Sequence, residues 1–346
     1  MLLNKLTIII ILFTFLFSCK NTPIKSKEED GLIHKAEILF KTNQKESFKL
    51  FNELIVKYPD NEKVNYYLGC FYAQSLNYDL AFKYLHKTIE INPKKWEAYK
   101  EIGKIYKSLN KYEEALKHIE KIFIFTSEAD AESNFFMGFL LNKVKKNENS
   151  ENIEKYYLNA IRLEPKYIMV YIHLGSFYFS LKQFEKAKEI WEKGLTFDEN
   201  NLTLLERSAS LQISLKNYKK AIENYEKLIK YHPNYVESYF NIGKCYEYLN
   251  DFEDALKSYN EAIKINPNYQ FAKQAIGEIY LTQKNYKEAL NIFTDLFKTT
   301  SEPFYLYKQG LIHKILNDAN NLKITIQSLS DLKEERAKEY LNLLKK

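Results

Sequence analysis

Glycine, proline and cysteine are scarce in this sequence of 346 residues, which contains 9 Gly, 7 Pro and 3 Cys. The catalytic motifs built on such residues are missing as well. No glycine-rich phosphate loop, G-x-S-x-G turn, CxxC pair or HExxH pair occurs. The six histidines lie far apart along the chain: His34, His86, His118, His173, His232 and His313. We therefore expect no catalysis, no cofactor, no bound metal and no small-molecule substrate.

The sequence also lacks a large excess of either positive or negative charge. Lys and Arg number 51 and Asp and Glu number 45, which gives a formal net charge of +6. Spread over so long a chain, this excess is weak evidence for nucleic acid, and we expect no nucleic-acid partner. Aromatic residues, by contrast, are abundant, with 28 Tyr and 23 Phe. A hydrophobic content of 45% is ample for a folded protein.

A repeated pattern dominates the sequence and is clearest in residues 236–269. Two stripes of apolar residues at helical spacing are separated by Asn250 and Asp251. The stripes consist of Tyr239, Ile242, Tyr246 and Leu249, and of Phe252, Ala255, Leu256, Tyr259, Ala262 and Ile263. The second ends at Pro267, because proline disfavours helix in the residue before it. Gly243 recurs 34 residues later as Gly277, and a 34-residue period of two helices indicates a solenoid.

These landmarks resemble the tetratricopeptide repeat family, which has Leu-Gly at positions 7 and 8, Ala at 20 and Pro at 32. The resemblance implies an all-α, right-handed superhelical solenoid of about eight helix-turn-helix pairs with a C-terminal capping helix. Small residues at positions 8 and 20 should lie where the two helices of a pair cross most closely. The cap should bury Leu332, Tyr340, Leu341 and Leu344. We expect the solenoid at 31–330 and the capping helix at 331–346.

The first nineteen residues, MLLNKLTIIIILFTFLFSC, predict export to a membrane. Lys5 precedes an apolar run of 12 residues, Leu6 to Phe17, which suits a signal-peptide core and is short for a bilayer span. The segment ending at Cys19 resembles a bacterial lipobox, although Phe17 departs from its usual pattern. We expect a signal peptide at 1–18, and a lipidated Cys19 with a polar tether at 19–30. The alternative is an uncleaved signal anchor formed by Leu2 to Phe17.

Two further features stand out from the repeat pattern. The repeat at 131–167 is three residues longer than the reference repeat, and its polar stretch at 145–152 predicts a longer turn between the helices. That turn is either a contact point or a tolerated surface insertion. Cys70 and Cys245 lie about five repeats apart, so they should be too distant for a disulfide. Shielding from solvent is expected for Cys245 and is left open for Cys70.

Known members of the family bind peptides in a concave groove lined by the first helix of each pair. Carried over by position, the resemblance assigns to this groove Tyr66, Lys100, Lys104, Lys107, Phe135, Phe139, Met169, Ile172, Phe179, Ile213, Phe240, Lys244 and Tyr248. The apolar members predict a partner site, because exposed apolar stripes mark interaction surfaces. The alternative is that some of them pack against neighbouring repeats.

Three of the groove residues, Lys100, Lys104 and Lys107, form a row on one helix face. The row could hold an acidic peptide or a terminal carboxylate. A solvated lysine face, partly paired with Glu97 and Glu101, is the interpretation that the sequence favours.

The predicted function is a non-catalytic, membrane-anchored scaffold that binds a peptide segment of a cell-envelope protein. Its location would be the bacterial cell envelope, on the periplasmic or surface side. The alternative function is an inner-membrane assembly or chaperone factor held by the uncleaved anchor.

Overall fold

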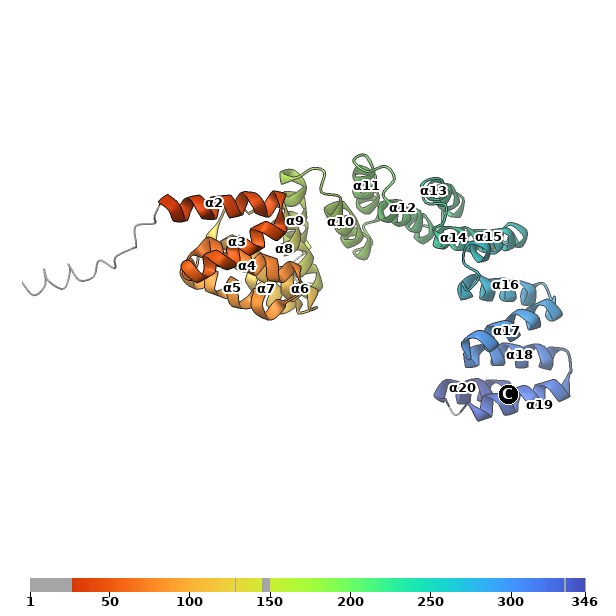
Figure 1. Cartoon of the computed structure of the whole chain (residues 1–346). Helices are drawn as coiled ribbons and strands as arrows, with labels where there is room; N and C mark the ends of the chain where they lie inside the picture. Colours follow the sequence, from red (N-terminus) through yellow and green to blue (C-terminus); the bar gives the residue numbers. More distant parts are fainter. Residues whose placement is uncertain (1–26, 128, 145–149, 333, 346) are drawn as a thin grey trace, which may run out of the picture. The chain divides into compact units, whose positions relative to one another are not determined.

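The computed structural model describes residues 27–127, 129–144, 150–332 and 334–345 (Figure 1). These residues form nineteen helices and no strand. They divide into two compact units, with the boundary between Leu163 and Glu164. Each unit is an all-α repeat solenoid, as the sequence predicted. The signal peptide and Cys19 lie outside the described residues.

Unit 1 contains four helix pairs. They are α2 (Lys27–Thr42) and α3 (Gln44–Lys57), α4 (Glu62–Gln74) and α5 (Tyr78–Ile91), α6 (Trp96–Ser108) and α7 (Tyr112–Phe125), and α8 (Ala131–Val144) and α9 (Ser150–Leu163).

Unit 2 contains five pairs and a final single helix. The pairs are α10 (Ile168–Ser180) and α11 (Phe184–Leu195), α12 (Leu202–Ser214) and α13 (Tyr218–Tyr231), α14 (Val236–Tyr248) and α15 (Phe252–Ile265), α16 (Gln270–Thr282) and α17 (Tyr286–Thr300), and α18 (Pro303–Ile315) and α19 (Ala319–Asp331). The single helix is α20 (Glu335–Lys345). The described residues thus contain nine pairs, one more than the eight or so expected.

The turn inside a pair has the same backbone conformation in seven of the repeats. The residue at position 15 takes a left-handed φ of 55–63°, whatever its type: Leu76, Asn110, Lys182, Lys216, Asn250, Lys284 and Asn317. A left-handed residue just after a helix is a common way to end it. The next helix often starts with a side-chain cap. Asp251 Oδ1, for example, accepts a hydrogen bond from the backbone N of Asp254 at 3.2 Å.

Glycine at position 8 lets the two helices of a pair approach closely. A Cβ atom added to Gly243 would lie 2.5 Å from Cε1 of Tyr259, and one added to Gly277 would lie 2.9 Å from Cζ of Phe293. Both aromatic rings are fully buried. The expectation from the sequence, that small residues mark the closest crossing, is confirmed at these sites.

The hydrophobic core runs from each pair into the next. One cluster joins Ala81 and Leu85 of α5 to Ala98, Ile102 and Ile105 of α6. Similar clusters join α13 to α14, α15 to α16, and α17 to α18. Each pair therefore completes its core only with its neighbours, as expected for a solenoid.

The ends of the repeat region differ in detail from the sequence predictions. Helix α2 begins at Lys27, inside the tether predicted at 19–30, with an acidic first turn of Glu28, Glu29 and Asp30 that suits a helix start. Of the predicted long turn at 145–152, residues 145–149 lie outside the described residues. The other three, Ser150 to Asn152, form the first turn of α9.

Helix α20 covers the last pair. Leu344 and Ala337 of α20 are buried in one cluster with Leu306 of α18 and Leu329 of α19, and Leu332, Tyr340 and Leu341 pack against it. In other repeats, the residue at position 24, on the second helix, packs against the glycine at position 8. In the last pair, Leu344 of α20 does so instead, because a Cβ added to Gly310 would lie 2.6 Å from Cδ1 of Leu344. The predicted role of this segment as a cap agrees with these contacts.

Candidate functional site

The predicted lysine row lies on α6, but two of its amino groups are engaged within the protein. Lys100 is only 8% exposed. Its Nζ lies 2.6 Å from Oδ2 of Asp130 and 3.0 Å from Oε2 of Glu132. Lys104 Nζ lies 2.8 Å from Oε1 of Glu132 and 3.0 Å from Oε1 of Glu101. The prediction of a solvated lysine face is therefore wrong for Lys100, and an acidic ligand would have to displace these carboxylates.

The pKa values of Asp130 and Glu132 are shifted by the same ion-pair network. Burial raises the pKa of Asp130, but hydrogen bonds from Lys100 and Ser133 outweigh it and hold the pKa below its usual value. Burial likewise opposes ionisation of Glu132, and the bonds and charges of Lys104 and Lys100 again lower its pKa. The network joins α6 to the start of α8, so its evident role is to fix this junction between repeats.

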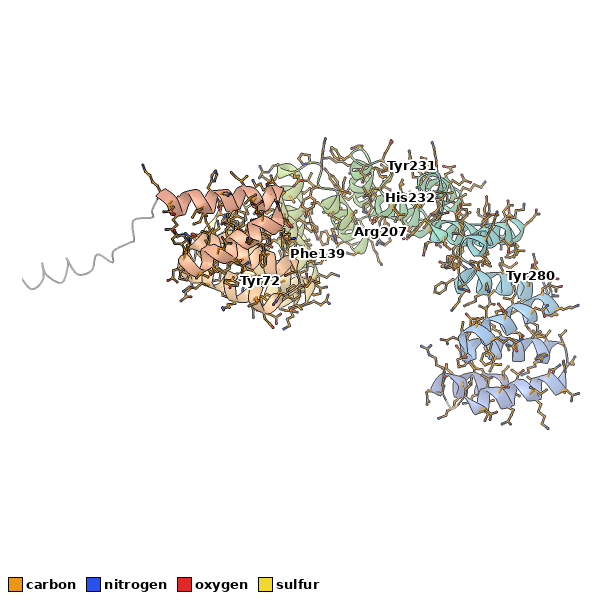
Figure 2. All side chains as sticks on the ribbon, in the orientation of Figure 1. Tyr72, Phe139, Arg207, Tyr231, His232 and Tyr280 are labelled. Carbon is orange, nitrogen blue, oxygen red and sulfur yellow. The ribbon has the colours of Figure 1, made fainter. Side chains whose placement is uncertain are left out.

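The rest of the row contacts aromatic rings. Lys107 Nζ lies 5.1 Å from the ring centroid of Phe136 and 5.4 Å from that of Phe139, which Figure 2 labels. Phe139 and Phe135 are buried, and the Phe135 ring lies 6.1 Å from that of Tyr157. Phe139 contacts Tyr112 of the neighbouring repeat, with ring centroids 6.2 Å apart, as the alternative of packing against neighbouring repeats describes, whereas Phe135 packs against Tyr157 of its own repeat.

Tyr66 and Cys70 lie one turn apart on α4; Tyr66 is partly buried and Cys70 is buried. Lys95 Nζ lies 5.3 Å from the Tyr66 ring centroid. Burial raises the pKa of the Cys70 thiol to about 12 and that of Cys245 to about 11. Both cysteines are free and buried, so Cys70, which is 7% exposed, is shielded from solvent as Cys245 is.

The predicted residues of α10 and α12 are less enclosed. Met169 is 46% exposed at the start of α10. Phe179 is half-buried, with its ring 5.4 Å from that of Phe184 and 6.1 Å from that of Trp191. Ile172 and Ile213 are also half-buried, and Ile213 packs against the core cluster of α12 to α14. Met169 is the residue of this group with the most surface to offer a partner.

A hollow of about 170 Å³ lies on the first helices of unit 2, between α14 and α16, and we call it the α14–α16 pocket. It is lined by Phe240, Lys244, Glu247, Phe271, Gln274, Ala275 and Glu278. The Phe240 and Phe271 rings lie 6.3 Å apart. Tyr269 supports both, with its ring 5.7 Å from each. Two aromatic rings thus form an apolar wall beside a set of polar groups.

The charges of the α14–α16 pocket are balanced inside the protein. Lys244 Nζ lies 3.3 Å from Oε1 of Glu247, and Glu247 also accepts a hydrogen bond from the Tyr259 hydroxyl. Across the pocket, Lys308 Nζ lies 2.7 Å from Oε1 of Glu278. With both signs paired, the site does not have the excess positive charge that would select an acidic peptide.

The sequence analysis identified some of the residues that line this pocket and missed one exposed aromatic residue. Phe240 and Lys244 line the pocket. Tyr248 does not line it: this side chain is 53% exposed and stacks on Tyr218 of the preceding repeat, with ring centroids 4.8 Å apart. Phe271 was missed, although it is 65% exposed. It stands at position 2 of its repeat, the position that identified Met169, so the same rule would have found it.

Within the parts of the chain that the structure describes, no group of three or more His, Cys, Asp or Glu side chains is arranged to hold a metal. None of the helices in these parts combines the length and apolar character that crossing a bilayer requires.

Three family models match the chain, and all describe the same repeat. A tetratricopeptide repeat model matches residues 236–269, a second matches 97–123 and 170–201, and a TPR repeat model matches 211–249. This protein contains tetratricopeptide repeats. The matched residues fall on α6 and α7, α10 and α11, and α12 to α15, so they confirm the repeat register in both units.

The curated relatives match only part of this chain and a smaller part of their own length. Tetratricopeptide repeat protein 6 of Homo sapiens is 28% identical over 132 residues, covering 37% of this chain and 24% of that protein. Protein O-mannosyl-transferase TMTC3 of Homo sapiens is 25% identical over 182 residues, covering 48% of this chain and 19% of that protein. The chain spans less than a third of the length of the curated relatives it matches.

The fold of this tetratricopeptide repeat protein recurs among solved structures. The C-terminal part of a TPR repeat-containing protein from Cytophaga hutchinsonii aligns with a TM-score of 0.53 at 17% identity, covering 78% of this chain and 95% of that one. At such identity the likeness shows the fold alone. Tetratricopeptide repeats are typically non-catalytic and bind protein or peptide partners, which is consistent with an interaction scaffold.

Proposed function

We propose that this protein is a membrane-anchored scaffold that binds a peptide segment of a cell-envelope protein on the first helices of its repeats. The α14–α16 pocket is the binding point with the strongest support. The observation that carries the proposal is Phe271, a large aromatic side chain that remains 65% exposed beside a formed hollow. Exposed aromatic residues next to pockets are typical anchors of protein interfaces.

The paired charges indicate what kind of segment the pocket would accept. Lys244 and Glu278 already have partners of opposite sign in Glu247 and Lys308. A ligand carboxylate would have to break one of these pairs, whereas an apolar side chain could contact Phe240 and Phe271 without doing so. The expected ligand is therefore a peptide with an apolar anchor, whose backbone amides could bond to Gln274.

Membrane anchoring rests on the sequence at residues 1–19. The apolar run ending before Cys19 suits a signal-peptide core, and the polar residues after it would separate the repeats from the membrane. A multi-chain lipid on Cys19 would give a stable attachment. The envelope location of the partner follows from this anchor.

The test of the binding point is photo-crosslinking in cells, with a photo-reactive phenylalanine analogue placed at Phe271 in one variant and at Phe179 in another. The control carries the probe at Lys257, an exposed residue on α15 that pairs with Glu253 and Asp254. We expect a discrete adduct at Phe271 and no matching adduct at Lys257. Equal smears at both positions, or no adduct at Phe271, would remove the pocket from consideration.

The partner named by such an adduct allows a second measurement. Phe271→Ser should weaken binding of the partner peptide at least tenfold, since interface aromatic residues commonly contribute about 2 kcal/mol or more. Phe197→Ser, which removes a surface aromatic residue of the same unit outside the pocket, is the matched control and should leave the affinity unchanged.

The anchor is tested separately with Cys19→Ala. Lipidation predicts that the wild-type protein incorporates labelled palmitate and that the variant does not. If the variant stays membrane-bound with unchanged mass, the uncleaved anchor from Leu2 to Phe17 is the correct alternative, and an inner-membrane assembly or chaperone role becomes the better proposal.

A further inference from the structure

Position 4 of the repeat carries a tyrosine in three repeats, and each makes the same hydrogen bond. The hydroxyls of Tyr99, Tyr171 and Tyr239 donate to the carbonyl oxygens of Pro93, Pro165 and Pro233, at 3.2, 2.7 and 3.1 Å. The ring fills space beside the second helix. The Tyr99 ring lies 5.5 Å from that of Phe125, and the Tyr171 ring lies 5.8 Å from that of Phe197. In these repeats a ring therefore occupies the junction between successive pairs.

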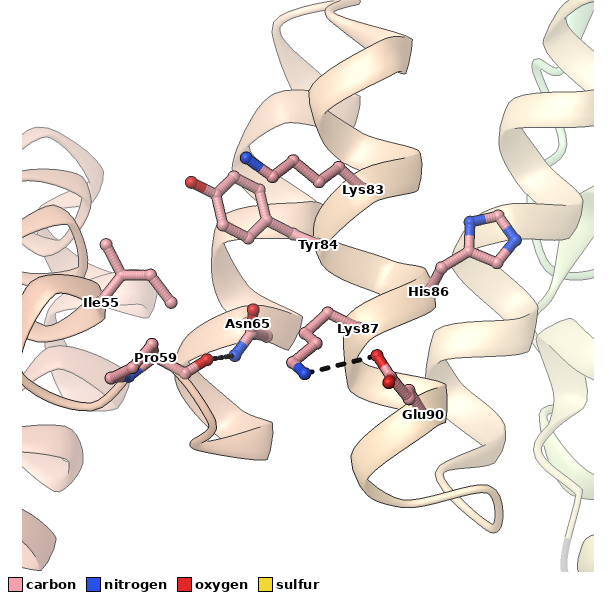
Figure 3. Close-up of a pocket in the computed structure, with 8 residues that line it drawn as sticks. All are labelled: Ile55, Pro59, Asn65, Lys83, Tyr84, His86, Lys87 and Glu90. Atoms are coloured by element: carbon pink, nitrogen blue, oxygen red, sulfur yellow. Dashed lines mark hydrogen bonds and ion pairs between the residues drawn. The ribbon is translucent and has the colours of Figure 1, made fainter.

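Asn65 replaces this tyrosine in the repeat formed by α4 and α5. Its Nδ2 donates to the carbonyl oxygen of Pro59 at 2.8 Å, so the hydrogen bond to the proline remains while the ring is absent. The junction is consequently open, with a cleft of about 600 Å³ that we call the Asn65 cleft. Figure 3 shows Ile55 and Pro59 on one side of it and Tyr84 on the other.

A second repeat lacking the tyrosine shows how such a gap can be closed. Asn134 stands at position 4 there, and its Nδ2 donates to the Ala129 carbonyl at 3.0 Å. The place of Ile55 is taken by Phe123, and that of Tyr84 by Tyr156. The two rings meet edge-on with centroids 5.1 Å apart. Ile55 lacks the ring that would reach Tyr84 in the same way.

Unit 2 has an equivalent cleft of about 350 Å³ where Lys273 stands at position 4. Ile263 and Ile292 take the places of Ile55 and Tyr84. There, Lys273 pairs with Asp295 at 3.1 Å, so the two charged groups of that cleft pair with each other.

The Asn65 cleft has a different charge pattern. The place of Asp295 is taken by Lys87, and Lys83 stands where unit 2 has Asn291. In Figure 3 the amino groups of both lysines lie on the side of α5 that faces Ile55, and the His86 ring points away from it. Lys87 pairs with Asp60 at 3.1 Å and with Glu90 at 3.3 Å, but both carboxylates are largely exposed, and such pairs are weak. Lys83 Nζ lies 5.6 Å from the Tyr84 ring centroid, and it has no ion pair with any described residue.

We propose that the Asn65 cleft binds an aromatic side chain of a partner protein that carries a carboxylate beside it. The ring would occupy the space that the position-4 tyrosine fills in other repeats, between Ile55 and Tyr84. The carboxylate would lie at Lys83 and Lys87. This site is in unit 1 and uses second-helix residues, so it is separate from the α14–α16 pocket and does not depend on the proposed function.

The experiment uses the folded chain and a fluorescent synthetic peptide with one Asp-Tyr pair in a Gly-Ser background. Binding is measured by fluorescence anisotropy and compared with peptides carrying Asp-Ala or Asn-Tyr instead. We expect the Asp-Tyr peptide to bind most tightly, with each replacement weakening binding at least about tenfold, because one removes a bond to a charged group and the other a buried ring.

Asn65→Tyr provides the main variant, because it restores the tyrosine of the sister repeats and fills the cleft from inside. It should abolish binding and leave the melting temperature equal or higher. Ile55→Phe copies Phe123 and fills the cleft from the other side, which keeps the test valid if Asn65→Tyr does not fold. Lys273→Tyr, which fills the equivalent cleft of unit 2, is the matched control and should bind the peptide normally. Unchanged binding to both filled variants, or equal affinity for the Asp-Tyr and Asp-Ala peptides, would overturn the proposal.

Discussion

Gly243 packs against the ring of Tyr259 so closely that a methyl group on the glycine would lie 2.5 Å from Cε1 of the tyrosine. The ring cannot move aside easily, because it is fully buried and its hydroxyl is bonded to Glu247. This contact explains why the repeat needs glycine at position 8 in the middle of a helix, where glycine is otherwise unfavourable.

Gly243→Ala should therefore lower the free energy of unfolding by about 1–3 kcal/mol, the usual cost of overpacking a core. Gly31→Ala is the matched control, since Gly31 lies inside α2 and nothing stands within 4 Å of its added Cβ. That control should raise the free energy of unfolding by about 0.5–1 kcal/mol. Urea unfolding followed by circular dichroism measures both. Equal effects of the two substitutions would show that the contact with Tyr259 does not limit the site.

Leu76 occupies a left-handed backbone conformation with φ of 60° and is 71% exposed. A leucine there has steric strain of about 1–2 kcal/mol that asparagine largely avoids. Leu76→Asn should therefore raise the free energy of unfolding by about 0.5–1 kcal/mol. The reverse change at the equivalent turn, Asn250→Leu, should lower it by a similar amount. If both substitutions shift the unfolding midpoint in the same direction, backbone strain is not the controlling factor.

The buried cysteines predict a difference between folded and unfolded protein. Burial raises the pKa of Cys70 to about 12 and that of Cys245 to about 11, so the reactive thiolate is rare at pH 8. In a Cys19→Ala background, neither thiol should react with Ellman's reagent within minutes, and both should react once guanidinium unfolds the chain. Rapid reaction of one equivalent in the native protein would show that one thiol is accessible without global unfolding.

The repeat register could be predicted from the sequence because it depends on local requirements. Gly243, Ala255 and Pro267 are each required by steric contacts or backbone geometry within one helix pair. Their regular spacing along the chain is therefore enough to identify the repeat. The cap was predictable for a similar reason, since Leu341 and Leu344 lie on the apolar stripe of a short terminal helix. Even the opening of the Asn65 cleft has a sequence signal, because asparagine stands where neighbouring repeats carry tyrosine.

Contacts between repeats were harder to predict. Lys100 and Lys104 were correctly placed on one helix face, but their shared partner Glu132 comes from the following repeat, and Asp130 directly precedes that repeat. Whether such residues meet depends on how neighbouring pairs stack, and the spacing within one helix does not contain that information. The stacking of neighbouring pairs also decides which aromatic residues are buried. Phe139 is buried against neighbouring rings, whereas Phe271 remains exposed.

The ion-pair network around Lys100 predicts a pH dependence of stability. The folded-state pKa values of Asp130 and Glu132 lie below their ordinary values, which are about 4. The stabilisation is then fully present above about pH 4 and is lost as the pH falls through the folded-state values. Lys100→Met should lower the free energy of unfolding by about 1–3 kcal/mol at pH 7, because it removes two bonds between charged groups.

As the pH falls below about 4, the carboxylates take up protons, first in the unfolded chain, so the difference between wild type and Lys100→Met should be smaller at pH 2.5 than at pH 7. Urea unfolding is followed by tryptophan fluorescence in a Trp191→Phe background, in which the signal comes from Trp96 alone, whose ring lies 5.3 Å from Lys100 Nζ in this unit. Lys264→Met is the matched control, because Lys264 forms an exposed pair with Glu261 at 3.4 Å and should contribute little at either pH. A difference for Lys100→Met that stays constant from pH 7 to pH 2.5 would mean that Lys100 stabilises the junction through the packing of its aliphatic chain. Packing, and not the ion pairs, would then be the main contribution of Lys100 to stability.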